Sequence, residues 1–123
     1  MKFFALCLDY LGMKLSLKGS VLDLALLSTL KGGGAHGYEL IAELRKRSRG
    51  VLDLAQGTVY PALHRLEKAG FVSSEWERIS GRRTRHYTLT PKGRKELAHW
   101  NAEWRKFSAG FDNVMQWRLG CPG

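Results

Sequence analysis

The sequence of 123 residues predicts a mostly helical α+β fold, with three short helices, a two-stranded hairpin and a long final helix. One observation is a short helical pattern that ends at Gly70 and is followed at once by two alternating segments around Ser80 and Gly81. Another is the spacing of three and four between bulky apolar residues from Leu97 to Val114, which predicts one long helix. A helix followed directly by an arginine-tipped hairpin is the layout of a winged helix-turn-helix domain.

Composition and charge favour a polyanionic partner. The formal charge is +9, from 20 Lys and Arg against 11 Asp and Glu, and 44% of the residues are hydrophobic, enough for a core. Between residues 36 and 95 there are 13 basic and 6 acidic residues, so most of the excess surrounds the predicted winged helix. DNA fits this charge because each neutralised phosphate releases counterions. A merely soluble basic protein would have the same charge.

The ends of the chain carry little chemistry. Cys7 and Cys121 form neither a disulfide framework nor a metal-ligand pair, and we expect a cytoplasmic setting without a membrane. Residues 1–16 are expected to be an extension with a short helix, since Asp9 interrupts their apolar run. Translation could instead begin at Met13. We expect the winged helix at residues 17–90, a dimerisation helix at 91–116 and a tail at 117–123.

Three helices precede the hairpin. Residues 17–30 are apolar around most of a helical circumference, which predicts burial on several sides, and the glycines at 32–34 end this helix. The second helix is predicted from His36 to Ser48. Its predicted inward face is formed by Tyr38, Ile41 and Leu44.

The third helix is predicted over residues 56–69, with Val59, Leu63 and Leu66 facing inward and Gly70 ending it. Proline is tolerated in a first helical turn, so Pro61 predicts that this helix begins near Gly57 or Thr58, with Thr58 as the cap.

The hairpin strands are predicted at residues 71–79 and 84–90, and Thr90 followed by Pro91 predicts the start of the last helix. This helix carries a stripe of bulky residues at heptad spacing: Leu97, Trp100, Trp104, Phe107, Phe111 and Val114. We interpret the stripe as a dimerisation seam that packs on a second copy. The alternative is that the stripe folds back onto its own domain, against the first helix.

A catalytic or metal site finds almost no support. The four histidines lack metal-ligand spacing, and no nucleophile elbow, phosphate loop or dinucleotide fingerprint is present, so we expect neither enzyme activity nor a metal or cofactor. The outer face of the third helix is a better candidate, because polar side chains near a helix N-terminus can reach base edges and phosphates. Its candidate DNA-binding residues are Gln56, Thr58, Tyr60, His64, Arg65 and Lys68.

The hairpin tip adds three candidates for contact with the DNA backbone or minor groove: Arg82, Arg83 and Arg85. Clustered like charges repel unless an anion is the partner, although a solvated loop is the alternative for this tip. Tyr60 borders the apolar face and could instead pack in the core. His64 and Arg65 could be solvated, or Arg65 could pair with an acidic residue.

Three segments, GAHGYELIAEL (34–44), GTVYPALHRLEKAGFV (57–72) and GRRTRHYTLTPKGRKEL (81–97), resemble the PadR family of bacterial transcriptional regulators in order and spacing. The likeness covers about residues 17–115. Thr58, Tyr60 and Pro61 fall in the family's Thr-Leu-Tyr-Pro stretch, with Val59 in place of the usual Leu. The long second dimerisation helix of some members is missing, so the chain is similar to the short-armed subgroup.

The resemblance implies a homodimeric repressor that binds a pseudo-palindromic operator and is released by a small aromatic or hydrophobic effector. Some relatives hold flat ligands between aromatic residues at the dimer centre, which makes Trp104, with Trp100, a candidate effector contact; the alternative is a plain dimer core. We therefore predict a sequence-specific transcriptional regulator. A non-specific architectural DNA-binding protein is the alternative, and an enzyme is a third class with almost no support from the residues.

Overall fold

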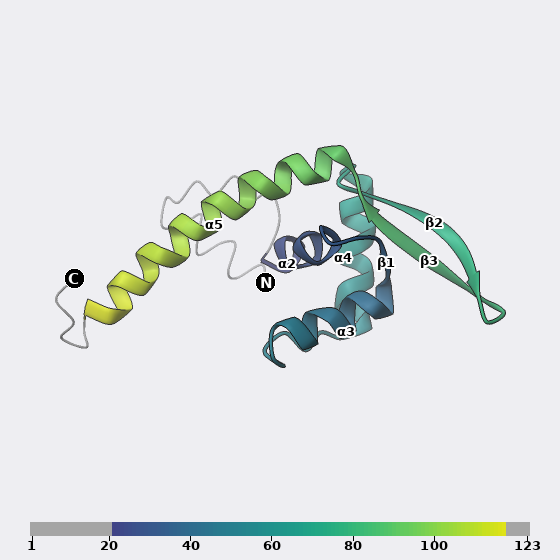
Figure 1. Cartoon of the computed structure of the whole chain (residues 1–123), viewed down its shortest axis with the longest axis horizontal. Helices are drawn as coiled ribbons and strands as arrows, with labels where there is room; N and C mark the ends of the chain where they lie inside the picture. The colour runs from purple at the N-terminus through teal and green to yellow at the C-terminus, as the bar shows by residue number, and fades with distance from the viewer. Residues whose placement is uncertain (1–20, 118–123) are drawn as a thin grey trace.

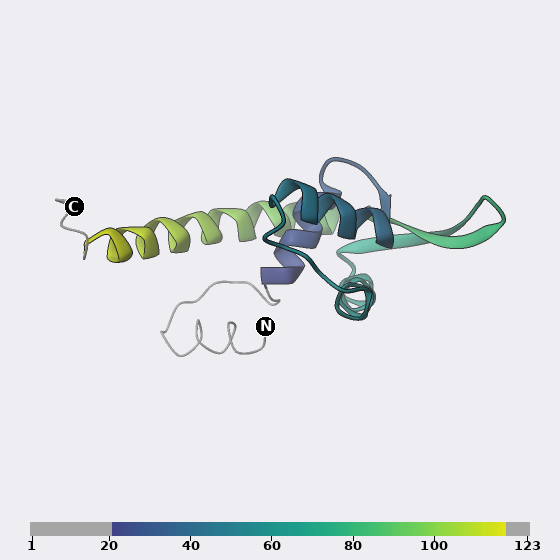
Figure 2. The same ribbon diagram turned by 90° about the horizontal axis from the view of Figure 1, so that it is seen from below.

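The computed structural model describes residues 21–117, so the predicted extension at 1–16 and nearly all of the tail lie outside the described residues. The helices are α2 (Val21–Leu30), α3 (Gly37–Arg47), α4 (Gln56–Lys68) and α5 (Pro91–Trp117), and the strands are β1 (Ala35–His36), β2 (Val72–Ile79) and β3 (Arg82–Leu89). The strands form one antiparallel sheet in the order β1-β3-β2. The predicted winged-helix architecture of the α+β class is confirmed. The β2–β3 hairpin, named the wing below, and α5 extend to opposite sides of the helical body (Figure 1; Figure 2).

The core is built around α2. This helix is apolar on nearly all sides, and it contacts α3, α4, α5 and β3. Leu26, Leu27 and Leu30 are fully buried there, as predicted for a helix without a polar face. From α4, Val59, Leu63 and Leu66 join the same core in the predicted orientation. The outer face of α4 is thereby left to solvent.

Two predictions about the segment before α4 were wrong. Residues 35–36 were expected to end a turn and start a helix, but they form β1, with Ala35 opposite Tyr87 on β3. This pairing joins segments about fifty residues apart, which local patterns do not reveal. On α3, Leu40 is buried while Tyr38 is exposed, so Leu40 takes the place that was predicted for Tyr38.

The start of α4 also differs from the prediction. Ala55 is the extended residue before the helix, and its carbonyl accepts bonds from the N–H groups of Thr58 at 3.0 Å and Val59 at 3.1 Å. Thr58 is therefore inside the helix and not its cap, and Pro61 lies in the second turn. The missing N–H of Pro61 affects only the carbonyl of Gly57, because helical bonds join residues four apart. Gly57 is exposed, so water can replace that bond.

The end of α4 agrees with the prediction. Gly70 has a φ of 84°, and the N–H of Phe71 donates to the Leu66 carbonyl at 3.0 Å, which is the bond of a Schellman motif. The wing turn also agrees, since Ser80 and Gly81 have φ angles of 52° and 79°, as a two-residue hairpin turn requires. These two turns hold the wing beside α4.

The predicted cap of α5 is confirmed. The hydroxyl of Thr90 accepts a bond from the N–H of Gly93 at 3.0 Å and donates to the carbonyl of Gly70 at 2.7 Å. The first half of α5 then packs on α2, and its second half extends away from the other described elements (Figure 1). Within residues 21–117, every helix is too short or too polar to cross a membrane.

Candidate nucleic-acid interface

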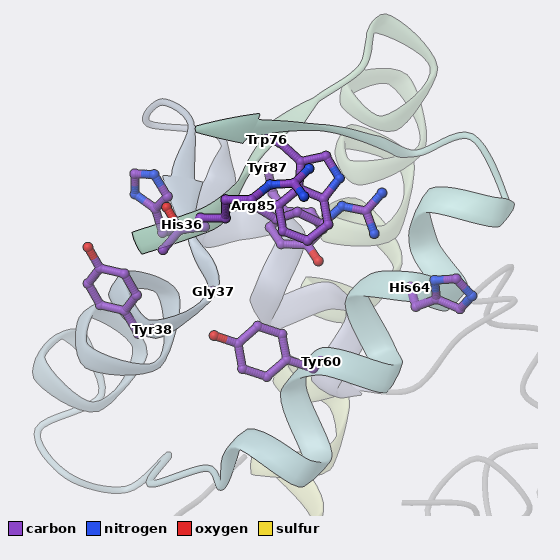
Figure 3. A pocket seen from close by; sticks show the side chains of 10 residues that line it. His36, Gly37, Tyr38, Tyr60, His64, Trp76, Arg85 and Tyr87 are labelled. Atoms are coloured by element: carbon purple, nitrogen blue, oxygen red, sulfur yellow. The ribbon is translucent and has the colours of Figure 1, made fainter. Parts of the chain in front are cut away.

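The outer face of α4 and the wing lie on the same side of the molecule, across a cleft of about 380 Å³. Figure 3 shows Trp76, Arg85 and Tyr87 on the sheet side of this cleft and Tyr60 on the α4 side. The cleft, named the wing cleft below, is lined by His36, Gly37, Tyr38, Tyr60, His64, Trp76, Arg83, Thr84, Arg85 and Tyr87. It is therefore aromatic and cationic together, a combination suited to an anion.

The structure brings some of the α4 candidates together and separates others. All six predicted side chains are exposed: Gln56, Thr58, Tyr60, His64, Arg65 and Lys68. Tyr60 and His64 line the wing cleft, whereas Gln56 and Thr58 lie in the first turn of α4. Lys68 is the last residue of the helix. The N-terminal half of α4 thus presents polar side chains beside the wing.

Tyr60 is held against the start of α3. A side chain at Gly37 would meet the Tyr60 ring at 2.5 Å, so the ring lies directly on the Gly37 backbone. Tyr60 is nevertheless partly exposed. It therefore belongs to the surface of the wing cleft and not to the core, and Gly37 is required for the close approach of the two helices.

Arg65 has a partner within the chain. Its Nη2 atom lies 2.5 Å from Oδ1 of Asp23, a carboxylate that is almost fully buried on α2. A buried carboxylate needs compensating charge or hydrogen bonds. Pairing with an acid was the alternative left open for Arg65 from the sequence. The pair joins α4 to α2 and engages one side of this guanidinium away from any ligand.

The wing arginines surround an aromatic ring that the sequence interpretation did not assign to the site. The guanidinium carbon of Arg83 lies 4.6 Å from the centre of the Trp76 ring, and that of Arg85 lies 4.9 Å from it. Trp76 is directly opposite Arg85 in the sheet, and it is 55% exposed. Strand alternation places residues 83 and 85 on one face, so the register predicted by the turn could have identified Trp76.

A buried histidine links the wing to α3. The Nδ1 atom of His36 contacts Glu39, and its Nε2 atom lies 2.9 Å from Oε2 of Glu77 on β2. The hydrogen bond with Glu39 is the main cause that raises the pKa of His36, and burial opposes it. The backbone bond from His36, followed by its side-chain bond, lowers the pKa of Glu39. The sequence interpretation had given His36 no specific role.

The predicted dimerisation stripe divides into two parts. Leu97 and Trp100 are buried in the core of their own domain, where Trp100 is 1% exposed and meets the Phe71 ring edge-on. The fold-back alternative therefore describes these two residues, and Trp100 has almost no surface left for a partner or an effector. Phe111, by contrast, is 53% exposed, and Val114 is exposed as well.

Trp104 lies where the two parts of the stripe meet. It is half-buried and packs on the core, and its ring centre lies 5.8 Å from that of Phe107. Phe107 continues the row toward Phe111, at 6.0 Å between ring centres. A cavity of about 310 Å³ follows this row, lined by Trp104, Phe107, Ser108, Phe111 and Asp112. Between residues 21 and 117, the structure shows no group of acidic, histidine or cysteine side chains that could hold a metal.

Comparison with known proteins identifies one family. Residues 26–99 match the family model of the "Transcriptional regulator PadR-like family". The chain is 45% identical over 62 residues to the transcriptional regulator Rv3488 of Mycobacterium tuberculosis, in a match that covers 50% of this chain and 55% of that protein. The match thus spans about half the length of that curated relative.

Solved structures agree with this match. A PadR family transcription regulator from hypervirulent Clostridium difficile is 30% identical, with a TM-score of 0.67, over 78% of this chain and 99% of its own. PadR from Bacillus subtilis, solved in complex with operator DNA, is 27% identical, with a TM-score of 0.62, over 66% of this chain and 46% of its own.

Proposed function

Because the chain belongs to the PadR-like family of transcriptional regulators, we propose that it is a homodimer that binds a specific DNA operator. It acts as a repressor that a small aromatic or hydrophobic effector releases, and it has no enzymatic activity. The observation that carries the proposal is the shared face of α4 and the wing, where exposed polar side chains of a helix lie beside arginines. The operator complex of the Bacillus subtilis relative supports DNA as the partner.

On this proposal, α4 enters the major groove with its first turns. Gln56 and Thr58 are exposed there and carry the donors and acceptors that read base edges. Arg82 and Arg83, exposed at the wing tip, bind backbone phosphates, which position the protein without reading sequence. Lys68 contacts phosphate from the far end of the helix.

The second half of α5 supplies the dimer surface. Phe107, Phe111 and Val114 form an apolar row on a helix that extends away from its own domain, and a second copy can bury this row. Two-fold symmetry would place the two α4 helices about 34–36 Å apart, the distance between half-sites one helical turn apart. The cavity beside Trp104 is the proposed effector site, since it is lined mainly by aromatic rings.

The test compares duplex DNA from upstream of the gene with random duplex DNA across a salt series. A specific regulator binds the upstream duplex more tightly, whereas an architectural protein binds both equally. Arg82→Ala combined with Arg83→Ala should weaken binding to both duplexes and flatten the salt dependence by about one phosphate contact per arginine. Gln56→Ala should change preference at a few base pairs. Wild-type protein that binds neither duplex would refute the proposal.

A further inference from the structure

We propose that the wing cleft seats one backbone phosphodiester of duplex DNA, and that Trp76 positions the two arginines that hold it. The inference rests on the proposed function, because DNA is the occupant. It adds a site and a positioning residue, Trp76, to a face on which only the arginines and α4 had been considered.

The first argument is the exposed tryptophan between two cations. Trp76 is 55% exposed on a strand whose turn is polar, and both the Arg83 and the Arg85 guanidiniums lie within 5 Å of its ring centre. Two like charges held this close repel each other. Cation–π attraction to a shared ring opposes that repulsion by about 0.5–1 kcal/mol for each exposed contact. Trp76 therefore fixes where the two guanidiniums point.

The second argument is that these cations are not neutralised by the chain. Within residues 21–117, neither Arg83 nor Arg85 forms an ion pair, in contrast to Arg65 and Arg47. Nε of Arg85 and Oγ1 of Thr84 are buried and have no hydrogen-bond partner in the described part of the molecule. A guanidinium presents paired N–H donors that match two oxygens of a phosphate.

The third argument is position. Tyr60 and His64 reach the cleft from α4, and Arg83, Thr84 and Arg85 reach it from the wing. Figure 3 shows the Tyr60 ring facing the Trp76–Arg85 pair. An anion in the cleft would thus lie between the helix proposed for the major groove and the wing proposed for the backbone. A phosphodiester that flanks the groove occupies that place when α4 is inserted.

The test uses a substitution that leaves the net charge unchanged. Trp76→Ala should weaken binding to upstream and random duplexes alike, by about tenfold, and lower the salt slope by about 1, the loss of one phosphate contact. Trp76→Phe keeps an aromatic ring and should restore most of the affinity. Ile79→Ala is the matched control, because Ile79 is a partly exposed apolar residue of the same strand outside the cleft lining.

A direct measurement is acrylamide quenching of the fluorescence that Trp76 contributes, taken as the difference between wild type and Trp76→Phe. The duplex should shield this component, and inorganic phosphate at equal ionic strength should not. Shielding by inorganic phosphate alone would show a site for small anions and overturn DNA as the occupant. If Trp76→Ala binds duplex like wild type and the ring stays quenchable, the inference fails while the proposed function stands. If wild-type protein binds no duplex, the proposed function itself fails.

Discussion

Replacing His36 with Gln should remove a pH-dependent link between the wing and α3. The imidazole of His36 bridges Glu39 on α3 and Glu77 on β2, and hydrogen bonding to Glu39 is the main cause that raises its pKa above the ordinary 6.5. A raised pKa means that the folded state favours the protonated ring. The stabilisation is therefore complete below about pH 6.5 and is lost as the pH rises through the raised pKa.

Glu39 acts in the opposite direction. Bonds from the backbone and side chain of His36 lower its pKa below the ordinary 4.5, so its contribution is present above about pH 4.5 and is lost as the pH falls through the lowered pKa. The two conditions overlap between about pH 4.5 and 6.5. The link between α3 and the wing should be strongest in that window.

The magnitude follows from the exposure of the carboxylates. A hydrogen bond to a charged group contributes about 1.5–3 kcal/mol. The Glu39 and Glu77 side chains are 47% and 46% exposed, so solvent screening reduces both bonds. We expect His36→Gln to lower the free energy of unfolding by about 1–2 kcal/mol near pH 6. For a chain of this size, that corresponds to a fall in Tm of about 4–8 °C.

Thermal and urea unfolding of both proteins at about pH 5.5, 7 and 8.5 measures this difference. The gap should be largest near pH 5.5 and shrink with rising pH. His64→Gln is the control, since His64 is exposed on α4 and its loss should not alter the pH profile of stability. A gap that stays constant from pH 5.5 to 8.5, or grows with pH, would refute the reasoning.

Three further predictions follow from single contacts. Arg65→Ala should lower the free energy of unfolding in urea by about 1–3 kcal/mol, because buried Asp23 loses a charge-assisted bond; unchanged stability would show the pair to be unimportant. Phe111→Asp should give a monomer in sedimentation without loss of helical signal, since this ring is exposed on its own protomer; a persistent dimer would exclude it from the interface. Gly37→Ala should displace the Tyr60 ring and weaken duplex binding at unchanged net charge; wild-type affinity would show that the ring position is irrelevant.

The features that the sequence predicted correctly are those determined by near neighbours. The inward face of α4, the stop at Gly70 and the cap at Thr90 each depend on residues within one or two helical turns. The wing turn depends on two adjacent residues with positive φ, Ser80 and Gly81. Each of these patterns has one low-energy local structure, so the sequence alone was enough.

The features that were missed depend on distant partners. His36 and Glu77 are 41 residues apart in sequence, and β1 exists only because β3 lies beside it. Trp76 carries a role only through its contacts with Arg83 and Arg85 across the wing. The start of α4 was misplaced for a different reason: proline in a second turn disturbs just one carbonyl, and that carbonyl is exposed.

The stripe on α5 shows why periodicity alone could not separate folding from assembly. A heptad pattern predicts that one helical face is buried, but not by which surface. Here the first turns are fixed by the domain: a side chain at Gly93 would lie 2.1 Å from the Phe71 carbonyl, so α5 is pressed against the base of the wing. Trp100 fixes the next turns in the core. If a second copy binds at Phe111, the rigid contacts at Gly93 and Trp100 set the distance between the two α4 helices. Residues that touch no DNA would then determine which half-site spacing the dimer reads.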